Sequence, residues 1–220
     1  MSAAPTVSVG ERRRELQLAA VELFFAKGYE ATTIREIAQA LGIKSASIYY
    51  HWQSKEEILF DVIRSTMEQL AAGAKSVLGR ETGADRQLAG LVVHHVVIHA
   101  LRPKETTLGE TELRSLTGER RRDVQRMRDA YEQLVLGVVE QGAKDGLFRA
   151  LDHKLSAYAV IAQCTNVGIW FRENGRLGLD AIAAVYAGLA LRLVGGDAVD
   201  ENEIARLASA ARAFHDDYGP

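Results

Sequence analysis

The 220-residue sequence predicts an all-α protein with a small N-terminal domain and a larger C-terminal helical bundle. Three observations support this fold class. Long stretches rich in Ala, Leu, Glu, Arg and Gln lack the alternation of apolar and polar residues that a β-strand requires. Only three prolines are present, and glycines stand where the helical patterns end. A hydrophobic content of 47% allows both domains to bury a core.

Four helices are expected in the N-terminal part of the chain. The first carries an apolar stripe and ends at Gly28, because glycine commonly terminates helices. Thr33 and Glu36 have the spacing of a capping box, which indicates the start of the second helix. Ser54 and Glu57 repeat this spacing at the start of a long fourth helix. The expected spans are 11–26, 33–42, 45–51 and 54–77.

The rest of the sequence predicts a bundle of mostly long helices. Gly146, Gly175 and the pair Gly195 and Gly196 mark helix ends. The expected spans are 85–101, 107–116, 119–144, 152–173, 180–194 and 200–215. We therefore divide the chain into three parts, which are a flexible tail (1–10), an N-terminal helix-turn-helix domain (11–56) and a C-terminal helical domain (57–220).

Residues 33–51 have the spacing of a helix-turn-helix. Gly42 permits the tight turn between the second and third helices, and Ala38 is small where these helices cross. This arrangement leaves the third helix on the outside, where it can enter a DNA major groove. An ordinary helical corner with surface aromatic residues has the same spacing and is the alternative. The small core is expected to contain Leu23, Phe24, Ile37, Leu41, Ile43, Ile48, Ile58 and Leu59.

The segment 22–59, ELFFAKGYEATTIREIAQALGIKSASIYYHWQSKEEIL, closely resembles the DNA-binding domain of tetracycline-repressor (TetR) family regulators. The resemblance implies a homodimer that binds a double-stranded DNA operator. It also implies that Trp52, which stands where the family usually has phenylalanine, packs in the core. The residues that align with base-approaching positions are Arg35, Lys44, Ser45, Ser47 and Tyr49. Those that align with phosphate-facing or orienting positions are Thr33, Tyr50, His51 and Lys55.

The charge of the chain gives no general affinity for DNA. The formal net charge is -2, and the seven basic residues between Glu11 and Phe60 are balanced by seven acidic ones. Binding should therefore depend on a few well-placed contacts and on a dimer that engages two half-sites. Arg12, Arg13 and Arg14 are further candidates for phosphate contacts, with a solvated helix start as the alternative.

The cysteine content and the first ten residues predict a reducing compartment for the protein. Cys164 is the only cysteine, which excludes an intramolecular disulfide, and residues 1–10 lack the pattern of a signal peptide. The longest uncharged run, residues 155–171, contains polar side chains, so we expect a buried helix and no membrane contact. The predicted location is the cytoplasm.

The C-terminal domain has the features of a dimerisation and sensing domain. Residues 152–173 are apolar on nearly every side, so we expect this helix to be covered on all faces. Residues 180–194 are rich in alanine, which permits close approach of another helix. The TetR resemblance implies that these last two large helices form the homodimer and that a small molecule binds nearby.

The ligand pocket is expected between helix 54–77 and helix 152–173. Its candidate residues are His95, His99, Tyr131, Tyr158, Gln163, Asn166 and Trp170, and further polar candidates are Glu110, Glu112, Arg114 and Arg128. Solvated helix faces are the alternative for the charged residues. His95 and His99 have a spacing that can bind a metal, but no matched third ligand accompanies them. We therefore predict no metal and no other cofactor.

Residues 165–175, TNVGIWFRENG, resemble more loosely the C-terminal pattern of a TetR subgroup with members that respond to acyl-CoA thioesters. This resemblance implies a hydrophobic or acyl-CoA-type effector, with a planar drug-like compound as the alternative. Its binding would tilt helix 54–77 and release the operator. An enzyme is the main alternative class, but the sequence has no supporting nucleophile triad, phosphate loop or HExxH motif. A helical interaction module that does not bind DNA is the third class.

Overall fold

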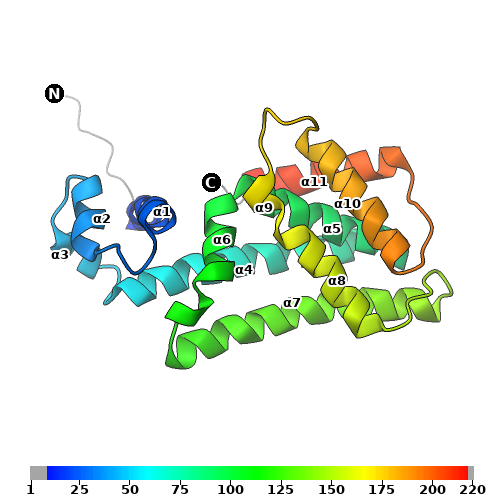
Figure 1. Ribbon diagram of the computed structural model, residues 1–220, viewed down its shortest axis with the longest axis horizontal. Coiled ribbons are helices and arrows are strands. Elements are labelled where there is room, and N and C mark those ends of the chain that lie inside the picture. The colour runs from blue at the N-terminus through cyan, green and yellow to red at the C-terminus, as the bar shows by residue number, and fades with distance from the viewer. Residues whose placement is uncertain (1–8, 218–220) are drawn as a thin grey trace.

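The computed structural model describes residues 9–217, which form helices and turns with no strand among them (Figure 1). The predicted all-α fold class is confirmed. Residues 1–8 of the predicted tail lie outside the described residues, whereas Gly10 already belongs to the first helix. The elements are α1 (Val9–Lys27), α2 (Ile34–Ala40), α3 (Ser45–Tyr49), α4 (Lys55–Arg80), α5 (Ala84–Leu101), α6 (Pro103–Thr111), the 3-10 helix η1 (Leu113–Ser115), α7 (Gly118–Lys144), α8 (His153–Thr165), α9 (Val167–Trp170), α10 (Leu179–Leu193) and α11 (Glu201–Asp217).

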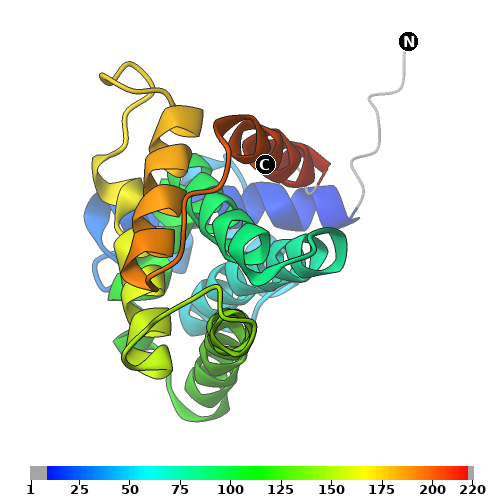
Figure 2. The same ribbon diagram turned by 90° about the vertical axis from the view of Figure 1, so that its right-hand side faces the viewer.

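The helices form a small N-terminal unit and a larger bundle that share one long helix. Figure 1 shows α1, α2 and α3 at one end of the molecule, with α4 running from them into the bundle. Within the bundle, α5 is enclosed by its neighbours (Figure 2) and contacts α4, α7, α8, α10 and α11. Its residues from Leu88 to Ala100 are all buried, which a helix that is apolar on nearly every side requires.

Two hydrophobic cores meet at Met67 of α4, which packs against both. The N-terminal core contains all eight residues that the sequence predicts for it, with Leu23, Leu41 and Ile43 partly buried at its edge. Bundle residues Leu108, Leu116 and Val124 complete this core. Because the bundle supplies these side chains, the domain boundary at residue 56 stays a prediction.

Most helix ends lie within three residues of the predicted spans, but two helices differ more. The helix expected over 107–116 begins at Pro103 and ends at Thr111, because proline fits the first helical turn, where its missing N–H has no helical partner. The helix expected over 152–173 is interrupted at Asn166, which separates α8 from α9. The interruption brings Gly168 against the end of α5, where a Cβ atom would lie 2.7 Å from the carbonyl oxygen of His99.

The expectation that helix 152–173 is covered on all faces is wrong for the single chain. Leu155 of α8 is 64% exposed and Ile169 of α9 is 62% exposed. The neighbouring helix α10 exposes apolar side chains as well. The exposed large apolar residues of α8, α9 and α10, which we call the apolar face, are Leu155, Tyr158, Ile169, Trp170, Val185, Leu189 and Leu193. A single chain therefore leaves an extended apolar surface in contact with solvent.

The crossing of α4 and α5 depends on a glycine. A Cβ atom on Gly73 would lie 2.0 Å from Cε1 of His94, whose buried ring fills the space between the helices. The ring is held by its Nε2, which lies 3.2 Å from the carbonyl oxygen of Leu70. Neither the ring nor the backbone of α4 can move without disturbing the other.

We expect Gly73→Ala to lower the free energy of unfolding by about 1–3 kcal/mol, because the added methyl overpacks this crossing. Chemical denaturation measures the change. Gly79→Ala on the same helix is the matched control, since open space surrounds Gly79. The control should raise stability by up to about 1 kcal/mol, because alanine has the higher helix propensity. Equal stability of the two variants would contradict the proposed packing.

Candidate DNA-binding surface and ligand cavity

The turn between α2 and α3 is built from local signals that the sequence displays. Thr33 caps α2: its hydroxyl accepts the N–H of Glu36 at 3.2 Å, and the Glu36 carboxylate accepts the N–H of Thr33 at 2.9 Å. An ion pair with Lys27 and these bonds to Thr33 lower the pKa of Glu36 to about 2. Gly42 then turns the chain with a φ of 64°, which glycine adopts without strain.

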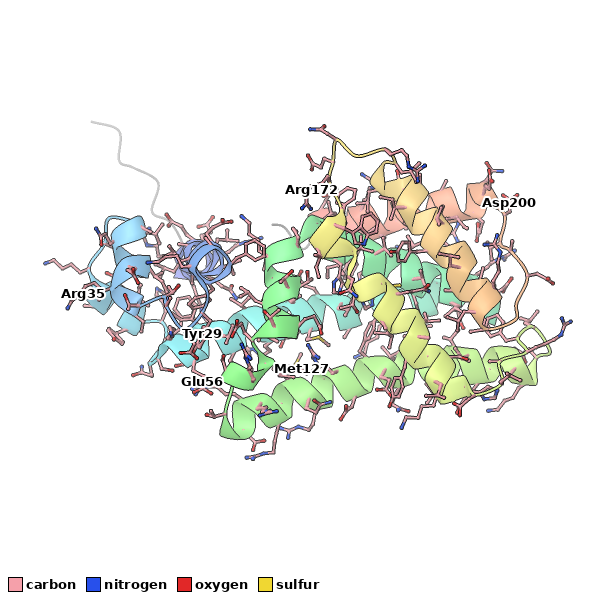
Figure 3. The ribbon with its side chains drawn as sticks, viewed as in Figure 1. Tyr29, Arg35, Glu56, Met127, Arg172 and Asp200 are labelled. Atoms are coloured by element: carbon pink, nitrogen blue, oxygen red, sulfur yellow. The ribbon has the colours of Figure 1, made fainter. Side chains whose placement is uncertain are left out.

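The region around α3 presents part of the predicted DNA-contacting set to solvent. Ile48 and Trp52 point into the core, and this fixes which face of α3 is outward. Arg35 projects from α2 at the outer end of the molecule (Figure 3). Ser45 and His51 are half-buried, and Thr33 is exposed while its side chain is used by the cap. The exposed members of the predicted set on and beside α3 are Lys44, Ser47, Tyr49 and Tyr50.

Lys55 has a second role that the sequence does not reveal. Its Nζ donates hydrogen bonds to the carbonyl oxygens of Tyr29 at 2.7 Å and Glu30 at 3.1 Å. The ammonium also lies 4.2 Å from the centre of the Tyr29 ring, within range of a cation–π interaction. Lys55 therefore ties the start of α4 to the loop before α2. Its expected phosphate contact stays a prediction, with one of three ammonium donors still available.

A buried carboxylate that sequence reasoning missed joins three parts of the N-terminal unit. Asp61 of α4 accepts the indole N–H of Trp52 at 3.0 Å, and it pairs with Arg13 at 2.5 Å and Arg64 at 2.7 Å. Trp52 is fully buried, as expected. The available signal was a lone aspartate within the apolar stripe of α4, since a buried charge requires partners. Partial burial, with Arg13 and Arg12 nearby, lowers the pKa of His51.

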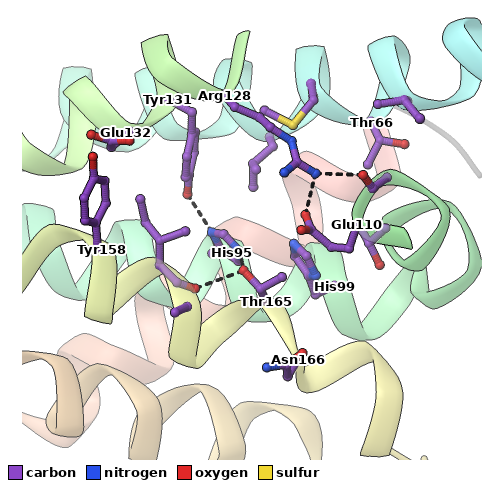
Figure 4. A pocket seen from close by; sticks show the side chains of 17 residues that line it. Thr66, His95, His99, Glu110, Arg128, Tyr131, Glu132, Tyr158, Thr165 and Asn166 are labelled. Carbon is purple, nitrogen blue, oxygen red and sulfur yellow. Dashed lines mark hydrogen bonds and ion pairs between the residues drawn. The ribbon is translucent and has the colours of Figure 1, made fainter. Parts of the chain in front are cut away.

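A cavity of about 440 Å³ lies inside the bundle, between α4, α5, α6, α7 and α8 (Figure 4). This is where the sequence predicts the ligand pocket. The predicted residues that line it are His95, His99, Tyr131, Tyr158 and Asn166, together with the polar candidates Glu110 and Arg128. Lining residues that sequence reasoning missed are Ile63, Thr66, Met67, Leu70, Thr106, Gly109, Glu132, Ile161, Ala162 and Thr165.

Four predicted pocket residues do not line this cavity. Gln163 lies on α8 but is absent from the cavity wall, as are Glu112 and Arg114. Trp170 lines a separate cavity of about 410 Å³ together with Tyr186 of α10. The interruption at Asn166 explains the position of Trp170, because α9 no longer continues the face of α8 that borders the first cavity.

A chain of hydrogen bonds fixes the protonation of His95 at the cavity wall. The Thr165 hydroxyl donates to the Ile161 carbonyl oxygen at 3.0 Å, so its oxygen accepts from Nε2 of His95 at 3.4 Å. The Nδ1 atom of His95 then accepts the hydroxyl of Tyr131 at 2.9 Å (Figure 4). His95 is therefore neutral, with its proton on Nε2. The chain connects α5, α7 and α8.

Burial keeps the three histidines of α5 neutral. It lowers the pKa of His94 and His99 to about 4 and that of His95 well below its usual range. Burial also raises the pKa of Cys164 to about 12, so its thiol stays protonated. The rings of His95 and His99 stack at 4.5 Å and do not converge on a shared point. Among the described residues no cluster of three metal-ligating side chains exists.

Three charged side chains, Glu110, Arg128 and Glu132, line the cavity together with the histidine chain. Arg128 of α7 donates from Nη2 to the carbonyl oxygen of Gly109 at 2.7 Å and to Glu110 at 2.9 Å. Its Nε is buried and has no hydrogen-bond partner among the described residues. An unsatisfied guanidinium N–H is costly in an apolar surrounding. Glu132 is the other carboxylate of the wall.

A helix-turn-helix joined to a helical bundle with an internal cavity is typical of transcriptional regulators that sense small molecules. Two family models match the chain: one described as bacterial regulatory proteins of the tetR family at residues 18–62, and one described as tetracyclin repressor-like, C-terminal domain, at residues 81–194. The chain belongs to the TetR family of bacterial regulatory proteins. The relationship predicted from residues 22–59 is confirmed.

Relatives and solved structures of this family cover most of the chain. The HTH-type transcriptional repressor KstR2 of Rhodococcus jostii is 30% identical over 183 residues, which are 82% of this chain and 89% of the relative. A tetR-family regulatory protein from Rhodococcus RHA1 has a TM-score of 0.80 at 31% identity, covering 84% of this chain and 97% of that one. AibR, solved with isovaleryl coenzyme A and operator DNA, has a TM-score of 0.75 at 26% identity, covering 85% of this chain and 100% of that one.

No helix among residues 9–217 has the length and apolar character to cross a membrane.

The neutral histidines predict how stability depends on pH. As the pH falls from 6.5 towards 4, the unfolded chain binds protons at His94 and His99 that the folded chain excludes, so the folded state loses stability. His99→Gln should remove a share of this loss on the order of 2 kcal/mol. Denaturation at pH 7 and at pH 4.5 measures the slope. A variant with the same pH slope as the wild type would contradict the burial argument.

Proposed function

We propose that this protein is a transcriptional repressor that binds a palindromic operator as a homodimer and leaves it when a small molecule enters the 440 Å³ cavity. It would act in the cytoplasm, where bacterial DNA lies. One observation supports this proposal above all others. The helix α4 begins directly after the outer helix α3 and then lines the cavity with Ile63, Thr66, Met67 and Leu70.

The apolar face supports the homodimer. Its residues lie on α8, α9 and α10, and an exposed surface of this kind usually marks a contact with another molecule. Small exposed residues of these helices, Ala159 and Ala181, would let a second copy approach closely. Pairing about a twofold axis would bring α8 and α10 of two chains into a four-helix interface. The two α3 helices would then engage two half-sites.

The DNA contacts are proposed from the family resemblance and supported by exposure. Arg35, Lys44, Ser45, Ser47 and Tyr49 would approach base edges in the major groove, and Ser47 and Tyr49 are exposed on α3 as this role requires. Thr33, Tyr50, His51 and Lys55 would contact or orient phosphates. Because the N-terminal unit is not basic, affinity would come from two half-sites held in register rather than from net charge.

The effector we propose is a hydrophobic acyl compound, most simply the acyl part of a CoA thioester. AibR was solved with isovaleryl coenzyme A, and the cavity here has the size of a small-molecule site. Its apolar wall suits an acyl chain. The guanidinium of Arg128 at the cavity wall suits a carbonyl oxygen, and Glu110 and Glu132 would repel phosphate groups within the cavity.

Release of DNA would follow from movement of α4. An acyl chain that fills the cavity would press on Met67 and Leu70, while the first turns of α4 stay packed in the N-terminal core. A tilt of α4 would change the separation of the two α3 helices in the dimer, which must match half-sites about 34–36 Å apart. The effector must then bind the free dimer more tightly than the DNA-bound dimer, with a typical coupling of about 1–3 kcal/mol.

We expect the double variant Val185→Asp, Leu189→Asp to be monomeric, because the charges would be buried at the proposed interface. Sedimentation velocity checks the mass, and a gel shift with DNA from upstream of the protein's own gene checks binding. Operator affinity should fall about 100-fold or more, since each half-site is weak alone. Ala205→Asp, at an exposed position of α11, is the control and should stay dimeric. Tight operator binding by a monomer would refute the proposal.

The cavity is tested by Arg128→Met, which keeps the length of the side chain but removes its N–H donors. We expect the affinity for isovaleryl-CoA and longer acyl-CoA thioesters, measured by calorimetry, to fall about tenfold or more through loss of a charge-assisted hydrogen bond. Arg126→Met is the matched control, because Arg126 lies on the same helix and pairs with Glu119 and Asp123 at the surface.

The same calorimetry tests release when it is repeated with the operator present. Thioester affinity should be weaker for the operator complex than for the free dimer. Equal affinities would contradict release by the effector. If wild type and Arg128→Met bind thioesters with equal strength, the proposed position of the carbonyl oxygen is wrong. This result would not contradict release by the effector.

A further inference from the structure

The contacts of Trp52 exceed what packing requires. A phenylalanine would fill the same core position, yet the indole adds an N–H that must be satisfied once it is buried. That N–H reaches Asp61, a carboxylate that is itself only 8% exposed and pairs with two arginines. Replacing such a group by an apolar residue would avoid its desolvation cost, so its presence calls for an account in terms of function.

The bonds of Asp61 connect three helices at the end of α3. Trp52 continues the turn that follows α3, since its backbone N–H donates to the carbonyl oxygen of Ile48 at 3.0 Å. Arg13 comes from α1, lies 5.2 Å from the centre of the Trp52 ring and bonds to the same carboxylate oxygen as the indole. Asp61 and Arg64 belong to α4. The carboxylate therefore holds the last turn of α3 against both α1 and α4.

This anchor controls a rotation that packing alone leaves free. α3 has only five residues, and among them Ile48 alone is buried. One buried side chain restrains the position of so short a helix but not its angle about its own axis. Trp52 supplies the second point, and the hydrogen bond to Asp61 sets the direction in which the indole enters the core. Tyr49 and Tyr50 lie between these two points and project outwards.

We propose that Asp61 is a positioning residue that sets the rotation of α3 on the DNA through the indole N–H of Trp52. This inference rests on the proposed reading of DNA by α3. Base discrimination depends on the direction of short side chains at base edges, so a small rotation weakens it. Phosphate contacts tolerate such a rotation better, because long cationic side chains follow the backbone. Loss of the anchor should therefore reduce sequence discrimination more than general DNA affinity.

The test is selection of binding sites from a random double-stranded DNA library by the full-length wild type, Trp52→Phe and Asp61→Leu. Trp52→Phe keeps an aromatic ring in the core but removes the N–H together with the rest of the larger indole. Asp61→Leu leaves the indole in place and removes its acceptor, so it separates the loss of the hydrogen bond from the loss of packing volume. We expect the preference of Trp52→Phe for the selected bases facing α3 to fall about tenfold, the size of one lost base contact. The slope of affinity against salt concentration should stay unchanged, because this slope counts phosphate contacts. Asp61→Leu, which leaves the indole N–H without an acceptor, should show the same pattern.

Glu81→Gln is the matched control. Glu81 is also a buried carboxylate with an arginine partner, Arg206 at 2.5 Å, but it lies at the far end of α4. The Glu81→Gln variant should have a lower melting temperature than the wild type and the same base preference. If Trp52→Phe lowers the melting temperature like the control and keeps full base preference, the anchor is only structural and the inference is overturned. If the wild type itself selects no sequence, the proposed function fails, and the inference fails with it.

Discussion

The structure depends on one helix that belongs to two hydrophobic cores. Ile58, Leu59 and Ile63 of α4 are buried in the N-terminal core, Leu70 and Ala74 are buried in the bundle, and Met67 lies between them. Protein interiors are close-packed, so neither core can accommodate a shift of α4 without repacking. A displacement of α4 therefore reaches both cores together. This sharing makes a single 26-residue helix a mechanical connection between cavity and DNA surface.

The chemistry of the cavity follows from its burial. Charged histidines would be too costly inside the bundle, and the chain from Tyr131 through His95 and Thr165 to Ile161 satisfies both ring nitrogens of His95 without any charge. The cavity wall is largely apolar, and its charged side chains are Glu110, Arg128 and Glu132. The proposed effector would be selected by its shape and by the position of an acceptor oxygen near Arg128.

Much of the fold was predictable because its signals are local. The capping box at Thr33, the N-cap at Ser54 and the turn at Gly42 depend on neighbours in sequence, and they locate α2, α3 and the start of α4. The interruption at Asn166 was not predictable, because it depends on contact of Gly168 with a distant carbonyl group. In the cavity, polar residues such as His95 stood out on an apolar helix. The α4 lining was missed because Met67 and its neighbours look like ordinary core residues in sequence.

The completion of the N-terminal core by Leu108, Leu116 and Val124 limits how this protein can be taken apart or recombined. A fragment that ends at residue 56 lacks these three side chains and the α4 residues from Ile58 to Ile63, so it would expose the interior of its own core. A hybrid that joined this helix-turn-helix to a foreign bundle would need matching apolar residues at the corner between α6 and α7. Exchange of DNA specificity between relatives is thus easier through substitutions on the outer face of α3 than through transfer of the whole module.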